Sequence, residues 1–214
     1  MVQVGAEMNS PGGIFQFTPN QITAPNGTTV TFQFSGSPGN HSITQSSFDS
    51  PCQPLQGGFD SGWVLITSTT PLSPLPEWNL TITNDQMPIW FYCKQLLPSP
   101  HCLAGMVGAI NVQNSSANSF TAFQSNALKT SGNPGQSQNG LVGLGASASA
   151  EPFVPSGATH FPLSAAASAT APGGASGGAA PTTSSTTGDT VALTAHFNLL
   201  AILVGLISSS VLFL

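Results

Sequence analysis

The sequence predicts an all-β domain, a Greek-key sandwich or barrel of seven to eight short strands, followed by a disordered stalk and a hydrophobic tail. Three observations predict this organisation. Short runs rich in β-branched and aromatic residues occupy positions 1–113, clusters of proline and glycine separate these runs, and the composition changes sharply after residue 130. No segment of helical length with an apolar period of 3.6 residues occurs before residue 114.

The expected strands are short runs in which apolar and polar residues tend to alternate. Such alternation places every second side chain on the same face of a strand. In the run "PIWFYC" this rule puts Ile89, Phe91 and Cys93 on one face, so Cys93 points inward if that face is the core. The runs are 2–6, 13–17, 28–34, 40–46, 62–66, 78–83, 88–93 and 106–112.

Three further segments are expected after the β domain of residues 1–113: a possible short helix in 114–129, a low-complexity stalk in 130–190, and a spacer with a hydrophobic tail in 191–214. The helix is expected because Phe120, Phe123 and Leu128 are spaced roughly as one helical face. The stalk consists of Gly, Ser, Ala, Thr and Pro and can bury little apolar area. His160 and His196 receive no role in a site.

The C-terminal tail indicates how the protein is attached to a membrane. Residues 197–214 are apolar and follow a polar spacer with small residues, which is typical of a glycolipid (GPI) anchor signal with Ser184, Ser185 or Gly188 as the ω residue. A retained tail anchor is the alternative. We therefore expect an extracellular protein at the cell surface or in the cell wall, although the start "MVQVGAEM" lacks the features of a secretory signal.

The charge and the sequons fit this location. Only 2 residues are basic and 7 are acidic, so the chain has no footprint for nucleic acid and little electrostatic steering. Four N-x-[ST] sequons make Asn26, Asn40, Asn79 and Asn114 candidates for glycosylation.

The residues with soft metal-binding atoms gather in the segment "WFYCKQLLPSPHCLAGMVGAINV". Cys93 ends one expected strand, His101 lies in the following loop, and Met106 begins the next strand. His41 opens "HSIT", a run that would lie beside the Cys93 strand in a Greek-key sandwich. Two imidazoles, one thiolate and a weak thioether form the donor set of a type 1 (blue) copper site, so we predict one copper ion held by these four residues.

The three cysteines allow one pair and one free thiol in an oxidising compartment. Neighbouring side chains in extended backbone point in opposite directions, so if His101 faces the metal, Cys102 faces away and can reach Cys52. Cys93 then remains as the ligand. Pairing of Cys93 with Cys102 or Cys52 is the alternative.

These motifs resemble the cupredoxins, especially plant phytocyanins and the copper domain of fungal serine-rich, GPI-anchored surface proteins. The segments "NHSITQSSFDSPCQPLQGGFDSG", "WFYC" and "HCLAGMVGAINV" carry the resemblance, which covers residues 1–113. It implies the ligands His41, Cys93, His101 and Met106 and the disulfide Cys52–Cys102. The sequence departs from the family in one respect, because seven residues, "KQLLPSP", separate Cys93 from His101, more than in the plastocyanin-like and phytocyanin-like loops.

The resemblance also implies where electrons enter, because the family uses the edge of the second histidine ligand, here His101. An unknown redox partner is therefore expected to dock on an apolar patch formed by Leu96, Leu97, Pro98, Pro100 and Leu103. Ser42 is expected to hydrogen-bond the backbone near Cys93 and stiffen the site.

Four protein ligands leave no open position on a metal, so we expect a single-electron carrier and no enzyme. Two alternatives are a structural or adhesive cell-wall protein that uses the sandwich as a scaffold, and extracellular copper buffering.

Overall fold

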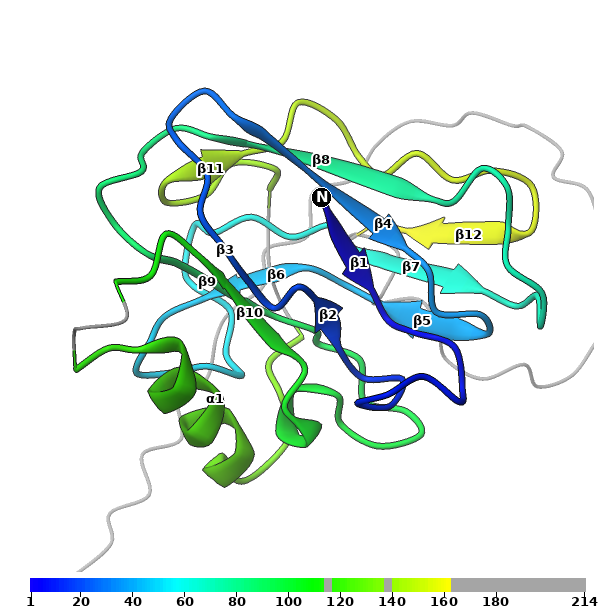
Figure 1. Ribbon diagram of the computed structural model, residues 1–214, viewed down its shortest axis with the longest axis horizontal. Coiled ribbons are helices and arrows are strands. Elements are labelled where there is room, and N and C mark those ends of the chain that lie inside the picture. Colours follow the sequence, from blue (N-terminus) through cyan, green and yellow to red (C-terminus); the bar gives the residue numbers. More distant parts are fainter. Residues whose placement is uncertain (114–116, 137–139, 163–214) are drawn as a thin grey trace, which may run out of the picture. The chain divides into compact units, whose positions relative to one another are not determined.

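The computed structural model describes residues 1–113, 117–136 and 140–162 (Figure 1), and most of their regular structure is β-strand. The predicted all-β fold class is confirmed. The strands are β1 (Val2–Val4), β2 (Phe17–Thr18), β3 (Gln21–Ile22), β4 (Thr29–Phe34), β5 (Gly39–His41), β6 (Thr44–Ser46), β7 (Trp63–Ile66), β8 (Glu77–Ile82), β9 (Ile89–Tyr92), β10 (Val107–Ile110), β11 (Ala146–Ser147) and β12 (Ala158–Phe161). The helices are the 3-10 turn η1 (Cys102–Ala104) and the α-helix α1 (Phe120–Lys129).

The strands form three sheets, with the orders β11-β8-β4-β1-β2, β3-β10-β9-β6 and β12-β7-β5. Most neighbouring strands are antiparallel, but β1 runs parallel to β4 and β3 runs parallel to β10. Parallel neighbours cannot be joined by a tight hairpin, so the chain must cross between sheets, as in a Greek-key sandwich.

The main core lies between the first and the second sheet. The ring of Phe91 on β9 lies 5.4 Å from that of Phe32 on β4 and 5.0 Å from that of Phe17 on β2, in edge-to-face contacts that join the two sheets. Gly108 pairs with Phe91 across β10 and β9, and a Cβ atom at this glycine would come within 2.3 Å of the ring. The aromatic core therefore requires a residue without a side chain there.

The run 40–46, expected as one strand, is divided in the structure. β5 pairs with β7 in the third sheet, whereas β6 pairs with β9 in the second sheet. The chain thus changes sheet at Ser42 and Ile43, where the backbone N–H of Ile43 donates to the Ser61 hydroxyl instead of to a strand. As a result, His41 at the end of β5 lies close to Cys93, which directly follows β9.

The helix α1 occupies the segment where a short helix was expected. The Ser119 hydroxyl caps its N-terminus by accepting a hydrogen bond from the N–H of Ala122. Phe123 is fully buried, and its ring lies 4.5 Å from that of Trp90 on the outer side of β9. Leu128, expected on the same face, is 56% exposed; Ala127 takes its place in the buried stripe. All four residues of β9 are buried because the core covers one face and α1 covers the other.

The stalk expected from residue 130 does not begin there, because residues 140–162 join the sandwich. Strand β11 adds to the edge of β8, and β12 adds to β7. The indole N–H of Trp78 also donates to the carbonyl of Ala150. The composition was misleading, since an open sheet edge offers backbone hydrogen-bond partners even to a segment with few large apolar residues.

Within the described residues, no helix has the length and apolar character needed to cross a membrane. The expected spacer and tail, 191–214, and the remaining part of the expected stalk, 163–190, lie outside the described residues, as do the ω candidates Ser184, Ser185 and Gly188.

Candidate metal centre

Three of the four predicted ligands meet in the structure. The nearest donor atoms of His41, Cys93 and His101 all lie within 4.8 Å of one another, and all three residues are buried. The Sγ of Cys93 lies 3.8 Å from Nδ1 of His41 and 3.4 Å from Nδ1 of His101. Both imidazoles therefore turn the same nitrogen, Nδ1, toward the sulfur.

Backbone hydrogen bonds close the loop that carries these ligands. Cys93 follows the last residue of β9, and its N–H donates to the carbonyl of Met106 at 3.1 Å. The N–H of Met106 donates in turn to the carbonyl of His101 at 3.0 Å. Met106 is fully buried in the same core cluster as Cys93. Its thioether as the fourth ligand remains a prediction.

Ser42 binds the backbone where the sequence led us to expect. Its hydroxyl accepts a hydrogen bond from the N–H of Lys94 at 3.0 Å and contacts the hydroxyl of Thr44 at 3.2 Å. Its own N–H points at the Sγ of Cys93, at 3.4 Å. Ser42 therefore ties the strand ends that carry His41 and Cys93 to each other, and it directs a donor at the sulfur.

Glycine backbone seals the far edge of His41. A Cβ atom built on Gly5 would lie 2.5 Å from Nε2 of His41, and one on Gly36 or Gly39 would lie 2.9 Å from it. Gly5 also has φ +74°, a conformation that glycine adopts without strain. The three glycines let the backbone pack directly on the imidazole, so only 3% of His41 is exposed.

His101 is held on two sides. Its Nε2 lies 3.1 Å from the carbonyl oxygen of Leu97, which can only accept, so Nε2 carries the proton and Nδ1 keeps a free lone pair. The ring of Phe15 stacks on the His101 ring with 4.0 Å between centroids. His101 is only 2% exposed, so the imidazole edge at which electrons are expected to enter is covered by other residues in this chain.

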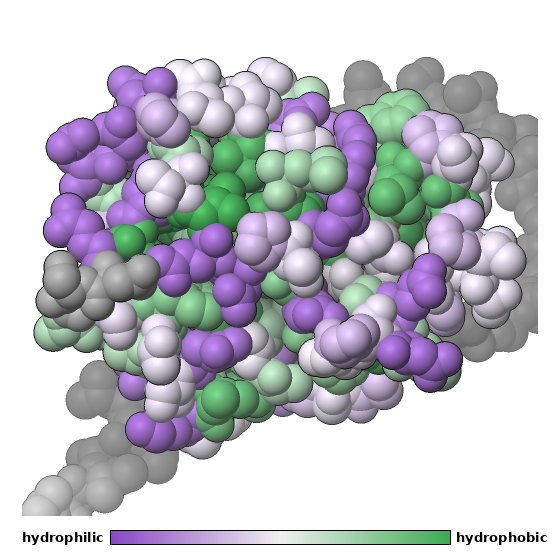
Figure 2. Space-filling view, viewed as in Figure 1, coloured by the Kyte–Doolittle hydropathy of each residue, from purple (hydrophilic) through white to green (hydrophobic). Residues whose placement is uncertain are grey.

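The expected apolar patch is open only in part. Leu97 is 74% exposed and Pro98 is exposed, whereas the other three members, Leu96, Pro100 and Leu103, are half-buried. On the face of the molecule in Figure 2, hydrophobic and hydrophilic residues form small areas that alternate across the surface.

Burial keeps both imidazoles neutral. It lowers the pKa of His41 to about 3, with a further contribution from His101, and it lowers the pKa of His101 to about 4. Burial raises the pKa of the Cys93 thiol to about 11, against an opposing effect of hydrogen bonds from the backbone of Gln95 and Ser42. At neutral pH the site thus offers two free imidazole nitrogens, and a metal ion would have to displace only the thiol proton.

A buried ion pair beside the site was missed by the sequence analysis. The Nζ of Lys94 contacts Oδ2 of Asp60, both side chains are fully buried, and the ammonium lies 3.9 Å from the centroid of the Trp63 ring. The N–H of Gly62 donates to the other carboxylate oxygen at 2.7 Å. Burial raises the pKa of Asp60 and lowers that of Lys94, while their mutual attraction opposes both changes. The available signal was a lysine directly after an inward cysteine in a chain with 2 basic residues.

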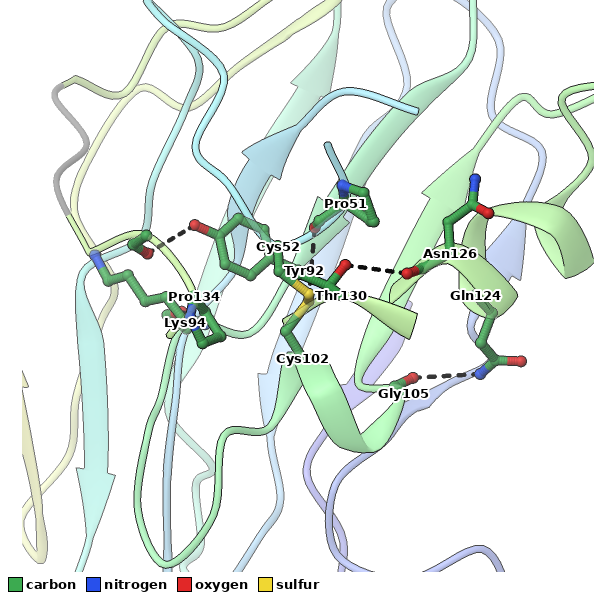
Figure 3. Close-up of a disulfide and its surroundings, with 12 residues drawn as sticks. Pro51, Cys52, Tyr92, Lys94, Cys102, Gly105, Gln124, Asn126, Thr130 and Pro134 are labelled. Carbon is green, nitrogen blue, oxygen red and sulfur yellow. Dashed lines mark hydrogen bonds between the residues drawn. A yellow bond between two sulfur atoms is a disulfide. The ribbon is translucent and has the colours of Figure 1, made fainter. Parts of the chain in front are cut away.

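The disulfide joins Cys52 to Cys102, with 5.8 Å between the Cα atoms, and leaves Cys93 as a free thiol among the described residues. Figure 3 shows this bridge at η1, with Gln124 of α1 donating to the carbonyl of Gly105 at the end of the same turn. The alternative pairings of Cys93 are excluded in this structure. The bridge and α1 together hold η1, which begins immediately after His101.

The four sequons differ in their surroundings. Asn26 and Asn79 are exposed, although the side-chain oxygen of Asn79 accepts a hydrogen bond from Thr31. Asn40 is half-buried and lies next to His41 in β5, and its Oδ1 is buried without a hydrogen-bond partner. Asn114 lies outside the described residues. Glycosylation of all four remains a prediction.

Known proteins resemble this chain in sequence. No protein-family model matches it. The chain is 37% identical over 137 residues to a protein of Arthroderma benhamiae named "Probable GPI-anchored cupredoxin-1", an alignment that covers 63% of this chain and 64% of that protein. It is 32% identical over 138 residues to an "Extracellular serine-rich protein" of the same fungus, covering 64% of this chain and 50% of the relative. The chain therefore spans less than two thirds of the length of either relative.

Solved structures with a similar chain course are also cupredoxins. One is a purple cupredoxin from Nitrosopumilus maritimus, with a TM-score of 0.36 and 17% identity, covering 52% of this chain and 97% of that one. Another is oxidised plastocyanin from Dryopteris crassirhizoma, with a TM-score of 0.32 and 21% identity, covering 52% of this chain and 98% of that one. The resemblance to fungal cupredoxins seen in the sequence is confirmed by the two fungal relatives.

Proposed function

We propose that this chain, a relative of fungal proteins named as a cupredoxin and as an extracellular serine-rich protein, binds one type 1 copper ion and carries single electrons at the cell surface. One observation carries the proposal: the donor atoms of His41, Cys93 and His101 lie within 4.8 Å of one another in a buried site. Met106 is the proposed weak fourth ligand. Two imidazoles with a thiolate and a thioether suit copper better than other biological metals.

The residues around the site favour a fixed geometry. Copper bound there would alternate between Cu(I) and Cu(II). The stack of Phe15 and the bond to Leu97 hold His101, the glycines hold His41, and the bond from Ser42 holds the sulfur. Ligands that are held in this way change little between oxidation states, which lowers the energy needed to reorganise the site when an electron is transferred.

Electron transfer is proposed in preference to bond-making catalysis. The proposed ligands fill the coordination positions, and none of His41, Cys93, His101 and Met106 is more than 3% exposed. A substrate would have no route to the metal without displacing a ligand. We therefore propose no catalytic residue.

The location at the cell surface is proposed on three grounds. The disulfide Cys52–Cys102 fits an oxidising compartment. One fungal relative is named as GPI-anchored and the other as extracellular. The apolar residues 197–214 resemble the signal for a glycolipid anchor, and that glycolipid would attach this chain to the membrane.

The test is a spectrum of the copper-loaded protein. The full chain is produced in a secreting host, purified in mild detergent, loaded with Cu(II), and compared with Cys93→Ser by visible and EPR spectroscopy. We expect an intense thiolate-to-copper band and a narrow copper hyperfine splitting that are lost in Cys93→Ser. His160→Gln is the matched control, because His160 lies on β12 and its Nε2 contacts the carbonyl of Ser61 instead of the site.

Other results would favour the two alternative functions. Copper that binds without the thiolate band, or that fails to bind, would leave a surface protein that uses the sandwich as a scaffold. A true type 1 spectrum combined with rapid loss of copper to a chelator would favour extracellular copper buffering. Slow loss together with reversible reduction supports the electron carrier.

A further inference from the structure

We propose that electrons enter and leave the centre through Phe15 and the surface hollow that it lines, and not through an exposed edge of His101. This inference rests on the proposed function, since it assigns a route to the electron transfer proposed above. Phe15 would thus form part of the electron path without being a ligand itself.

The first observation is that the ligands do not reach the surface. His101 is 2% exposed, His41 is 3% exposed, and Cys93 and Met106 are fully buried. An external redox partner therefore cannot contact any of these four residues directly. Because the rate of electron tunnelling falls steeply with distance, the covering residues decide where a partner comes closest.

The second observation is the position of Phe15 between a ligand and solvent. Its ring stacks on that of His101 with 4.0 Å between centroids and 28° between planes, which is van der Waals contact over the face of the ligand. Phe15 is itself half-buried, so part of its side chain remains accessible. The aromatic pair thus extends the imidazole toward the surface.

The third observation is a hollow of about 230 Å³ that Phe15 lines and His101 does not. Residues of two regions form it: Gly12, Gln16 and Asn20 near the N-terminus, and Ala104, Gly105 and Gln124 around η1 and α1. No charged residue lines the hollow. A flat aromatic group of the size of one ring would fit such a space, stack on Phe15 and meet amide groups at the rim.

One other route leads from His101 to the surface. Its Nε2–H donates to the carbonyl of Leu97, whose side chain is 74% exposed. The Phe15 route offers a broad ring-to-ring contact with the ligand and a concave place for the partner. The Leu97 route offers one hydrogen bond and a convex aliphatic side chain. These differences favour Phe15, and they make Leu97 the comparison that the experiment requires.

The experiment measures the oxidation of the reduced, copper-loaded full chain by tris(phenanthroline)cobalt(III), a one-electron acceptor with flat aromatic ligands. One electron passes from the copper centre to Co(III), giving Co(II), with no bond formed or broken and no proton transferred. We expect Phe15→Leu to keep the thiolate-to-copper band and to lower the second-order rate constant at least tenfold, after the rate is corrected for the change in reduction potential measured on the same variant. Phe48→Leu is the matched control, because the Phe48 ring packs on Trp90 and Phe123, away from the ligands.

Two further variants test the hollow and the alternative route. Ala104→Trp places a large side chain at the exposed rim of the hollow and should slow the reaction several-fold with an unchanged spectrum. Leu97→Ala should leave the rate within twofold of the wild-type value. A slow Leu97→Ala beside a normal Phe15→Leu, or an unchanged rate in Ala104→Trp, overturns the proposal.

A measurement on the metal-free protein checks the contact itself. The stacked Phe15 ring shields the His101 ring protons, so their NMR signals should move downfield in Phe15→Leu and stay unchanged in Phe48→Leu. Identical His101 shifts in the wild type and Phe15→Leu would contradict the stack. If the copper-loaded wild type shows no type 1 spectrum, the proposed function itself is wrong. The two failures are therefore distinguishable.

Discussion

The hydroxyl of Ser42 accepts a hydrogen bond from the backbone N–H of Lys94, at 3.0 Å and across a separation of 52 residues. Each partner directly follows a proposed ligand, since Ser42 follows His41 and Lys94 follows Cys93. Together with the N–H of Ser42, which points at the Cys93 sulfur, this bond sets the distance between two donor atoms. The bond is fully buried, so water cannot replace either partner.

Ser42→Ala should therefore destabilise the protein and alter the site. The change leaves the buried N–H of Lys94 without an acceptor, at a cost of about 1–3 kcal/mol in the free energy of unfolding. We expect a changed reduction potential, because the sulfur loses its fixed position. Urea denaturation and voltammetry measure the two effects, and Ser68→Ala is the control, because the hydroxyl of Ser68 makes an exposed hydrogen bond to the carbonyl of Thr70. An unaltered potential in Ser42→Ala would count against a role of this hydroxyl at the centre.

The ion pair of Asp60 and Lys94 should contribute to stability only while it is complete. Lys94→Met leaves the Asp60 carboxylate buried without its counter-ion, and we expect a loss of about 3–5 kcal/mol in the free energy of unfolding. Asp60→Asn combined with Lys94→Met should recover much of this loss, because it removes both charges and retains an acceptor for the N–H of Gly62.

The chain has one other lysine, Lys129, at the exposed end of α1, and Lys129→Met is the matched control for this experiment. Its cost should stay within about 0.5 kcal/mol, as for most surface substitutions. Urea denaturation of all variants in the metal-free form isolates the effect of the pair. If Lys94→Met and Lys129→Met lowered the free energy of unfolding equally, the buried pair would contribute no more to stability than an exposed lysine.

The metal-free protein should lose stability in mild acid. The pKa of His41 is lowered from 6.5 to about 3 and that of His101 from 6.5 to about 4, so below pH 6.5 the unfolded chain binds more protons than the folded one. Above pH 6.5 the histidines do not change the free energy of unfolding with pH. Below pH 6.5 this free energy decreases by about 1.4 kcal/mol per pH unit for each histidine that is protonated only on unfolding.

Urea denaturation between pH 7.5 and pH 4 measures this slope. The slope should persist in His160→Gln and become shallower in His41→Gln. In the copper-loaded protein the loss should move to lower pH, because protons must then compete with the metal for the imidazoles. A metal-free stability that does not change over this range would contradict the burial of two neutral histidines.

The helix α1 should stabilise the domain through Phe123. Its side chain is fully buried against Trp90, and Phe123→Ala should cost about 3–5 kcal/mol in the free energy of unfolding. Leu128→Ala in the same helix is the control, because Leu128 is 56% exposed and its loss should cost less than about 1 kcal/mol. Thermal unfolding would reveal a wrong assignment if both substitutions lowered the midpoint equally.

The sequence predicted the all-β class because alternation and turn residues are local signals. The types of the donor residues and their order along the chain are also visible in the sequence. His41, Cys93 and His101 could therefore be proposed together before their distances were known. The pairing of Cys52 with Cys102 was predicted on the assumption of extended backbone at His101 and Cys102. The pair is present, but His101 has helical backbone and Cys102 begins η1, so the reason for the prediction was wrong.

Composition is a poor guide to the structure after residue 130. Segment 140–162 looks like a linker, yet it supplies β11 and β12, because backbone hydrogen bonds at a sheet edge do not depend on large side chains. The ion pair of Lys94 and Asp60 was also not predicted, since 34 residues separate the two along the chain and the position of Lys94 after Cys93 does not identify its partner.

The sequence by itself determined most of the strands before residue 113 and which side chains carry metal-binding chemistry, because both depend on residue type and on spacing over a few positions. Only the tertiary structure decided that His101 is covered by Phe15 and that glycines seal His41. Gly5 lies 36 positions from His41, and Phe15 lies 86 positions from His101, so these two contacts form only in the folded chain. The cover over the two imidazoles is a property of the packed sheets, whereas local alternation could indicate only the inward face of a strand, as at Cys93.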